Sequence, residues 1–233
     1  MDRPRIVSRA EWLVARKELL AKEKQATRQR DALSAERRQL PMVRIEKEYF
    51  FDGPEGRRTL RDLFEGRRQL VVYHFMFDAS WDEGCKSCSY FADTFNGAIV
   101  HLRARDTAFA AISRAPLAKL EAFKRRMGWT FPWFSSANTD FNYDFHVSFR
   151  PDEDLSRAEY NYGKRGFPSS EAPGASVFLH GGSDVFHTYS TYARGLDHMI
   201  GTYNFLDLTP LGRNEEGLPY GMDWVRHHDK YTT

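Results

Sequence analysis

The sequence predicts an α/β fold in which a parallel βαβ unit is followed by an antiparallel hairpin. A short, strongly apolar run at residues 70–77 is typical of a central strand that is covered on both faces. The helix, strand and helix patterns that follow it, up to Gly128, complete the parallel unit. Two further strand patterns flank Gly181-Gly182-Ser183, which is a hairpin signal.

The N-terminal region is predicted to form one long helix over residues 8–40. Ser8 and Glu11 have the spacing of a capping box, and Pro41 ends the helix. Apolar residues recur every seven positions, but charged residues interrupt the seam and leave a thin apolar stripe. We therefore interpret residues 1–42 as a charged helical arm along the domain. An arm that joins copies of the chain into a homo-oligomer is the second interpretation.

The remaining elements are predicted from apolar periodicity and from glycine and proline punctuation. In order they are a strand at 42–52, a turn at 52–56, a short helix at 59–64, the strand at 70–77, a helix from Cys88 to about Arg103 that Gly97 weakens, a strand at 107–113, a helix from Pro116 to Met127, hairpin strands at 176–180 and 184–189, and a helix near 196–203.

Residues 129–172 form an aromatic-rich stretch without a regular pattern, and they are too long for an ordinary connection. We interpret them as an insertion that covers part of the core or lines a pocket. The predicted domain therefore spans residues 43–203, with this insertion inside it. Residues 204–233 contain several prolines and glycines and are predicted to form a tail that wraps the surface.

The two cysteines of the chain, Cys85 and Cys88, lie between the strand at 70–77 and the helix that follows. A C-x-x-C pair at this junction is where a thioredoxin-like fold has its redox dithiol. The helix dipole and the unpaired N–H groups at the helix start stabilise a thiolate there. We predict that Cys85 is the nucleophile and Cys88 the resolving thiol of thiol–disulfide exchange. A pair of inert, buried cysteines is the alternative.

Composition and motifs argue against several other classes of protein. A net charge of +2 without an aromatic-interleaved basic patch argues against a nucleic-acid partner. The longest apolar run is too short to span a membrane, and the N-terminus has no apolar core for a secretory signal, so we expect a cytoplasmic protein. Because further zinc ligands at suitable spacing and a nucleotide-binding loop are both missing, we expect neither a metal nor a bound cofactor.

Further residues are candidates for supporting or substrate-binding roles around the dithiol. The positive charge of Lys86 would lower the pKa of the neighbouring thiol, while carboxylates at 78, 82 and 83 would raise it. Residues on the predicted hairpin and just after it could donate protons or anchor a substrate, and ordinary packing is the alternative interpretation for them. The candidates are Lys86, Trp81, Ser176, His187, Tyr189, Tyr192 and Arg194.

Several longer strings run through the chain: RRQLPM at 37–42, YHFMF at 73–77, RRMGW at 125–129, HTYSTYARG at 187–195 and DLTPLGR at 207–213. Together they resemble a large bacterial family of unknown function that is described as predicted thioredoxin-like dithiol–disulfide oxidoreductases. The resemblance covers nearly the whole chain. It implies a thioredoxin-like fold and a dithiol redox activity, and it implies no substrate.

The dithiol motif departs from those of better-known relatives. Thioredoxins have Trp before the first Cys and Gly-Pro between the two, where this chain has Gly84 and Lys86-Ser87. They also place a cis-proline opposite the dithiol, where this chain has Ala175-Ser176. Peroxiredoxins have Pro seven and Thr three residues before the reactive Cys, and here these positions are Asp78 and Asp82. The Thr hydroxyl that would orient a peroxide is therefore missing.

These observations predict a thiol–disulfide oxidoreductase whose partners are a protein or small-molecule thiol or disulfide and a recycling reductant or oxidant. Two alternatives stay open. One is peroxiredoxin-like peroxide reduction through a sulfenic acid at Cys85. The other is a non-catalytic binding module of thioredoxin-like fold, in which the aromatic stretch at 129–172 holds a partner or small molecule.

Overall fold

The structure is a computed structural model, and it describes residues 4–164 and 166–232. The chain divides into two compact units, residues 1–41 and residues 42–233. Among the described residues, no helix has the length and the apolar composition needed to cross a membrane.

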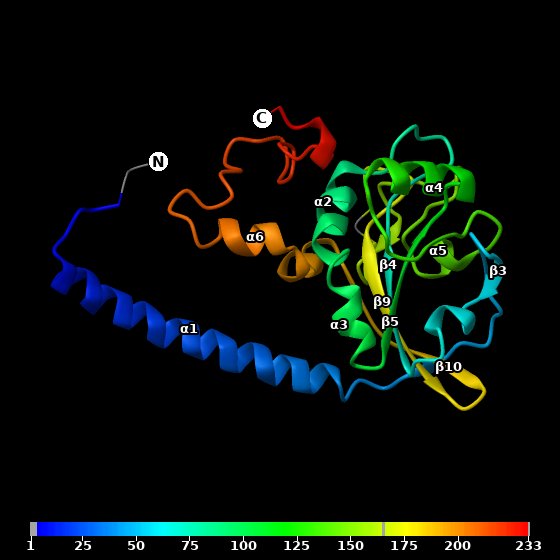
Figure 1. Ribbon diagram of the computed structural model, residues 1–233, viewed down its shortest axis with the longest axis horizontal. Coiled ribbons are helices and arrows are strands. Elements are labelled where there is room, and N and C mark those ends of the chain that lie inside the picture. The colour runs from blue at the N-terminus through cyan, green and yellow to red at the C-terminus, as the bar shows by residue number, and fades with distance from the viewer. Residues whose placement is uncertain (1–3, 165, 233) are drawn as a thin grey trace. The chain divides into compact units, whose positions relative to one another are not determined.

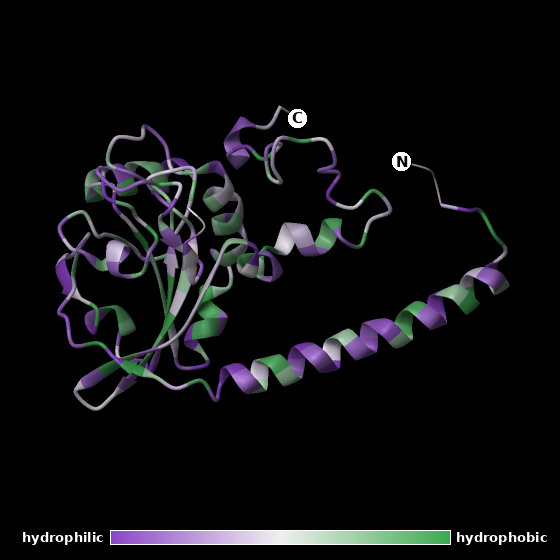
Figure 2. Ribbon diagram, turned by 180° about the vertical axis from the view of Figure 1, so that it is seen from behind, coloured by the Kyte–Doolittle hydropathy of each residue, from purple (hydrophilic) through white to green (hydrophobic). Residues whose placement is uncertain are grey.

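The first unit contains the single long helix α1 (Arg9–Arg37) (Figure 1). The predicted capping box is confirmed: the Ser8 hydroxyl accepts the N–H of Glu11 at 3.2 Å, and the Glu11 carboxylate accepts the N–H of Ser8 at 2.9 Å. None of the residues of α1 is buried, and hydrophobic residues are scattered along a largely hydrophilic helix (Figure 2). The homo-oligomer arm stays a prediction.

The second unit is built on an eight-stranded sheet with the strand order β1-β10-β9-β4-β5-β6-β2-β3. Its strands are β1 (Val43–Arg44), β2 (Phe50–Gly53), β3 (Gly56–Thr59), β4 (Gln69–His74), β5 (Thr107–Ser113), β6 (Trp133–Ser135), β9 (Gly174–Gly181) and β10 (Asp184–Tyr192). Strands β4, β5 and β6 are parallel, whereas β9 is antiparallel to β4 and to β10. A separate small hairpin joins β7 (Glu159–Tyr160) and β8 (Gly163–Lys164).

Short helices cover both faces of this sheet, with α2 and α3 on one side and α5 on the other in Figure 1. They are η1 (Asp62–Phe64), α2 (Lys86–Phe95), α3 (Ile99–Arg103), α4 (Leu117–Arg126), α5 (Phe141–Asp144), η2 (Ala193–Met199), α6 (Gly201–Leu206) and η3 (His228–Lys230). The succession β4, α2, β5 and α4, followed by the β9–β10 hairpin and α6, is the predicted thioredoxin-like α/β fold.

The alternation of side chains along β4 divides the core into two clusters. Tyr73 and Phe75 lie in the cluster that contains Cys88 and the apolar side of α2. Leu70 and Val72 point to the opposite face and join the second cluster. Successive side chains of a strand point to opposite faces, so each face of β4 has its own set of partners. The dithiol and the second cluster therefore lie on different faces of the sheet.

Several predicted elements differ from the structure. The short helix expected at 59–64 is reduced to the single 3-10 turn η1, and the helix expected near 196–203 is divided into η2 and α6 at Ile200, whose backbone is extended. The helix expected up to Arg103 is split by a turn at 96–98, where Gly97 disfavours the helix and the Asn96 side chain accepts the N–H of Thr130 at 2.9 Å. The strand expected at 42–52 is broken into β1 and β2, because only its ends pair with other strands. The sequence predicts no regular element in the stretch at 129–172, whereas β6 within it pairs in parallel with β5.

Candidate functional site

Backbone hydrogen bonds fix Cys85 at the N-terminal end of α2. Its N–H donates to the carbonyl of Met76 at 3.0 Å, and its own carbonyl accepts the N–H and the hydroxyl of Ser89, both at 2.9 Å. Cys85 is the N-cap residue and is half-buried, whereas Cys88 lies one turn further along and is buried. Both thiols are free. The loop after β4 thus leaves Cys85 partly accessible at the edge of the core cluster and keeps Cys88 inside it.

Close packing explains why a glycine precedes Cys85. A Cβ atom on Gly84 would come within 2.8 Å of the Phe75 ring and within 2.9 Å of the Phe123 ring. Both rings are buried in the core cluster that contains Cys88 and have little room to move. A tryptophan at this position, as in thioredoxins, would not fit, so the local packing accounts for this departure from the thioredoxin motif.

The ionised form of Cys85 is favoured by donors at the start of α2. The Cys85 sulfur does not meet the geometry of a helix-capping hydrogen bond, but donors at the start of α2 stand close enough to stabilise its charged form. A hydrogen bond from the Cys88 thiol, followed by the backbone N–H groups of Cys88 and Ser87 and the Ser87 hydroxyl, outweighs burial and lowers the pKa of the Cys85 thiol to about 7. Cys85 is therefore the thiol that can supply a nucleophilic thiolate near neutral pH.

The environment of Cys88 raises the pKa of its thiol, in contrast to that of Cys85. Burial, followed by the hydrogen bond and the charge of Cys85, raises the pKa of the Cys88 thiol well above its ordinary value. The sulfur accepts the backbone N–H of Met76 at 3.4 Å, and a hydrogen bond links it to the Tyr73 hydroxyl. The two thiols thus differ in exposure and in acidity. An attacking cysteine needs an accessible, acidic thiol, whereas a resolving cysteine can stay buried and protonated until it reacts.

The charged residues next to Cys85 are engaged by the C-terminal tail. Lys86 Nζ donates to the Asp223 carbonyl at 2.7 Å, so the amino group is held by the tail. The Glu83 carboxylate pairs with Lys230 at 2.7 Å and with Arg126. The negative charge that the sequence places two residues before Cys85 is therefore compensated by two cations. Among the described residues, no group of three or more His, Cys, Asp or Glu side chains could hold a metal ion.

Residues 223–230 form a C-terminal clamp on the loop that carries Cys85 (red in Figure 1). His227 is buried, and its Nε2 donates to the carbonyl of Gly84 at 2.8 Å. Since a carbonyl only accepts, Nε2 is the protonated nitrogen of the ring. The same ring packs edge-on against Phe123, with 5.3 Å between the ring centroids. The clamp thus contacts residues 83, 84 and 86, which flank Cys85 on both sides.

Ser176 and His187, two of the predicted supporting residues, belong to a buried polar chain on the other face of the sheet. His74 Nε2 and the Ser176 hydroxyl are 2.8 Å apart, the hydroxyls of Ser176 and Ser190 are 2.8 Å apart, and Ser190 and His187 Nε2 are 2.7 Å apart. Burial lowers the pKa of His74 to about 3, so this imidazole is neutral. This row of hydrogen-bonded side chains lies on the face of the sheet opposite to the dithiol.

The structure distributes the other predicted residues over separate places. Trp81 packs against the core cluster that contains Cys88, and Lys119 donates to its carbonyl. Tyr192 is buried in the second cluster and donates to the carbonyl of Phe145 at 3.1 Å. Arg194 is exposed and pairs with Asp197. Tyr189 lies on β10 next to a bulge in its pairing with β9. Ser176, His187 and Tyr192 therefore share a region with one another and not with the dithiol.

Two residues at the dithiol were not among the sequence candidates. Tyr73 could have been found from strand alternation, since it lies two residues before Phe75 on the face that α2 covers. His227 lies in the C-terminal tail, beyond the predicted domain at 43–203, and no local pattern in the tail indicates its contact with Gly84. A contact between such distant segments depends on the tertiary fold.

The lowered pKa of Cys85 predicts the pH dependence of its reactivity. Only the thiolate reacts with iodoacetamide, so the alkylation rate should rise with pH and reach half its maximum near pH 7. An ordinary thiol reaches this point near its unperturbed pKa of about 8.5. The rate can be measured by mass spectrometry in the Cys88→Ser variant, which leaves one thiol. A midpoint above about pH 8.5 would contradict the proposed role of the helix start.

Glu171, at the insertion's end, predicts a pH dependence of stability. Its carboxyl is buried, accepts the Ser148 hydroxyl at 2.7 Å, and burial raises its pKa from 4.5 to about 8. The native state therefore retains a proton that the unfolded chain loses, so this stabilisation is complete below pH 4.5 and is lost as pH rises through about 8. When the pH is raised from 5.5 to 8, the free energy of unfolding of the parent protein should fall by about 3 kcal/mol more than that of Glu171→Gln, as measured by urea unfolding. Equal losses would contradict a protonated Glu171.

Comparisons with known proteins complete the description of the site. Among solved structures, the chain is similar to peroxidoxin BcpB from Mycobacterium tuberculosis, with 15% identity over 70% of this chain and 94% of the other and a TM-score of 0.48. It is also similar to peroxiredoxin Q from Xanthomonas campestris, with 15% identity, coverage of 69% and 90%, and a TM-score of 0.45. A cysteine-to-serine variant of PrxQ from Xylella fastidiosa is similar with 14% identity over 67% of this chain and 88% of the other and a TM-score of 0.42.

These similarities are too distant to assign a reaction. Among curated proteins, none matches the chain. A match over residues 1–231 shows that the chain belongs to the family of bacterial proteins of unknown function DUF899.

Proposed function

We propose that this protein is a thiol–disulfide oxidoreductase that uses the Cys85–Cys88 dithiol. The observation that carries the proposal is the difference between two thiols one helical turn apart. Cys85 is half-buried and has a lowered pKa, whereas Cys88 is buried and has a raised pKa. The partner would be a thiol or disulfide of a protein or small molecule, and an external reductant or oxidant would recycle the pair.

The proposed reaction proceeds in two exchanges. The Cys85 thiolate attacks one sulfur of a substrate disulfide, the substrate S–S bond breaks, and the first substrate thiolate leaves with the bonding electron pair. The Cys88 thiol then loses its proton and attacks the Cys85 sulfur of the mixed disulfide, which releases the second substrate thiolate. The substrate gains two electrons and takes up two protons, and the protein ends with a Cys85–Cys88 disulfide. Because electrons pass between sulfur atoms, no bound cofactor is needed.

The raised pKa of Cys88 also sets the order of events. The hydrogen bond and the negative charge of Cys85 both contribute to that raised pKa. In the mixed disulfide the charge on Cys85 is gone, so this part of the effect disappears and the Cys88 pKa falls. Burial, the largest cause of the raised pKa, remains, but Cys88 becomes a better nucleophile once Cys85 has reacted. The pair suits a reducing compartment such as the cytoplasm, where dithiols act in catalysis rather than as structural bridges.

The alternative of peroxide reduction has less support from the site. Asp82 stands three residues before Cys85, so the hydroxyl that would orient a peroxide in a peroxiredoxin is missing. The donors that lower the pKa of Cys85 come mainly from Cys88 and the start of α2. These groups stabilise a thiolate without forming a dedicated peroxide pocket.

A comparison of two oxidants tests the proposal. The reduced protein is mixed in a stopped-flow instrument with 2-hydroxyethyl disulfide or with hydrogen peroxide, and disulfide formation is followed by quenching with an alkylating agent. We expect the disulfide to oxidise the pair faster than peroxide does at equal concentration. Faster oxidation by peroxide would favour the sulfenic acid route instead. A pair that resists both oxidants would leave only the binding-module interpretation.

A further inference from the structure

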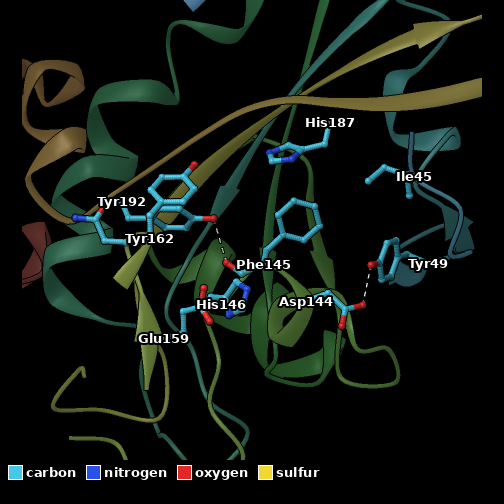
Figure 3. A pocket seen from close by; sticks show the side chains of 10 residues that line it. Ile45, Tyr49, Asp144, Phe145, His146, Glu159, Tyr162, His187 and Tyr192 are labelled. Atoms are coloured by element: carbon cyan, nitrogen blue, oxygen red, sulfur yellow. Dashed lines mark hydrogen bonds between the residues drawn. The ribbon is translucent and has the colours of Figure 1, made fainter. Parts of the chain in front are cut away.

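A cavity of about 300 Å³ lies among residues of β1–β2, the aromatic insertion and the end of β10. Figure 3 shows its lining side chains. Four of them present aromatic rings: Tyr49, Phe145, Tyr162 and Tyr192. Three of these rings belong to the second core cluster, and the fourth, Tyr162, packs against one of its members, so the cavity lies on the face of the sheet opposite to the dithiol.

Hydrogen bonds within the protein hold the tyrosine rings of the cavity in place. The Tyr49 hydroxyl donates to the Asp144 carboxylate at 2.7 Å, and the Tyr192 hydroxyl donates to the Phe145 carbonyl at 3.1 Å, as the dashed lines in Figure 3 mark. The Tyr162 hydroxyl donates to the Ser190 carbonyl at 2.9 Å. A ligand would therefore meet ring walls whose orientation is already set, which reduces the entropy lost on binding.

The charges around the cavity favour a cation. Its lining residues with a formal charge are the carboxylates Asp144 and Glu159, and the described lining includes neither Lys nor Arg. Asp144 pairs with Lys47 at 2.7 Å, whereas the Glu159 carboxylate has no hydrogen bond or ion pair with the part of the chain that the structure describes. Lys164 is the cross-strand neighbour of Glu159, and its positive charge partly offsets the negative charge of that carboxylate. Burial lowers the pKa of His187, so this imidazole does not repel a cation at neutral pH.

The backbone of the cavity wall is strained. His146, Asn161 and Tyr162 line the cavity with φ values of 52°, 51° and 61°, in the left-handed region that residues with a Cβ rarely adopt. Such residues concentrate at ligand sites, where the surrounding structure holds them. The Tyr162 side chain is held at the mouth of the cavity: the residue is 72% exposed, yet its ring packs edge-on against Tyr192 at 5.5 Å.

We propose that this cavity binds a small organic cation of the quaternary or methylated ammonium class. The Lys47 ammonium already lies 5.6 Å from the centroid of the Tyr49 ring, so the Tyr162 and Tyr192 rings would hold the cationic head by cation–π attraction. The Glu159 carboxylate would add a charge of opposite sign. A volume of about 300 Å³ is at the lower end for ligand sites, so the ligand is a small molecule. The inference does not depend on the redox chemistry of the dithiol.

Titration calorimetry with two probes of equal shape tests this proposal on the full chain. Choline carries a trimethylammonium head, and 3,3-dimethylbutan-1-ol is its neutral carbon analogue. We expect saturable binding of choline that is at least about tenfold tighter than binding of the neutral analogue. Absence of saturation by choline up to about 10 mM, or equal affinity for both probes, would overturn the proposal.

Two surface variants locate the binding. Tyr162→Ala removes an exposed ring and should weaken choline binding about fivefold. Glu159→Gln removes the negative charge of this carboxylate and should also weaken choline binding about fivefold. Glu216→Gln, at an exposed position of the tail outside the cavity, is the matched control and should bind choline like the parent protein. Unchanged binding in both cavity variants, with their circular dichroism spectra intact, would refute the site.

Discussion

Replacing Cys85 with serine is expected to lower the rate of disulfide exchange at least about a thousandfold, because a serine hydroxyl does not ionise near neutral pH. The variant should fold, since the side chain is half-buried and similar in size. The rate is measured with reduced protein and 2-hydroxyethyl disulfide. Ser87→Ala, between the two cysteines, is the matched control and should retain exchange, because its hydroxyl is only a minor contributor to the pKa of Cys85. A Cys85→Ser protein with full activity would contradict the assigned nucleophile.

Cys88→Ser should give the complementary result. The first exchange still forms a mixed disulfide on Cys85, but no resolving thiol remains to break it. Mass spectrometry should therefore detect one substrate thiol attached per chain, and the adduct should persist until an external thiol is added. Rapid spontaneous release of the adduct would show that Cys88 is not the resolving group.

His227→Ala is the second variant with a large expected effect. The substitution removes a buried ring and leaves the Gly84 carbonyl without its donor, which should lower the free energy of unfolding by about 2–4 kcal/mol. His228→Ala is the matched control, because this neighbour is exposed and pairs with Asp93 at the surface. Its expected loss is below about 1 kcal/mol. Urea unfolding of the two variants measures the difference.

The same pair of variants tests the positioning role of the clamp. Freed from His227, the loop should no longer hold Cys85 against the donors of α2, so the midpoint of its alkylation should move to higher pH. His227→Gln can donate to the Gly84 carbonyl from its side-chain amide and should restore part of the shift. If His227→Ala and His228→Ala gave the same alkylation midpoint, the clamp would have only a structural role.

Local signals made much of the fold predictable. Strand β5 spans the predicted residues 107–113, and α4 begins directly after Pro116, because apolar periodicity and proline act within a few residues. The hairpin β9–β10 turns at the predicted glycines. The position of Cys85 at the start of α2 also follows from local order along the chain.

Long-range contacts explain what could not be predicted. The three residues of β6 lie in an aromatic run without alternation, and only pairing with β5 makes them a strand. The contact of His227 with Gly84 joins segments that share no sequence pattern. Residues of the stretch at 129–172 belong to the second core cluster and line the cavity, and which of its aromatic residues do so depends on the folded backbone.

The redox midpoint of the Cys85–Cys88 pair tests the central claim most directly. The protein is equilibrated in glutathione buffers of graded potential, the free thiols are alkylated, and the oxidised fraction is read from the mass shift. A reversible midpoint between about −120 and −270 mV is expected, since this is the working range of thiol oxidoreductases. A pair that never forms a disulfide in these buffers would contradict the exchange mechanism.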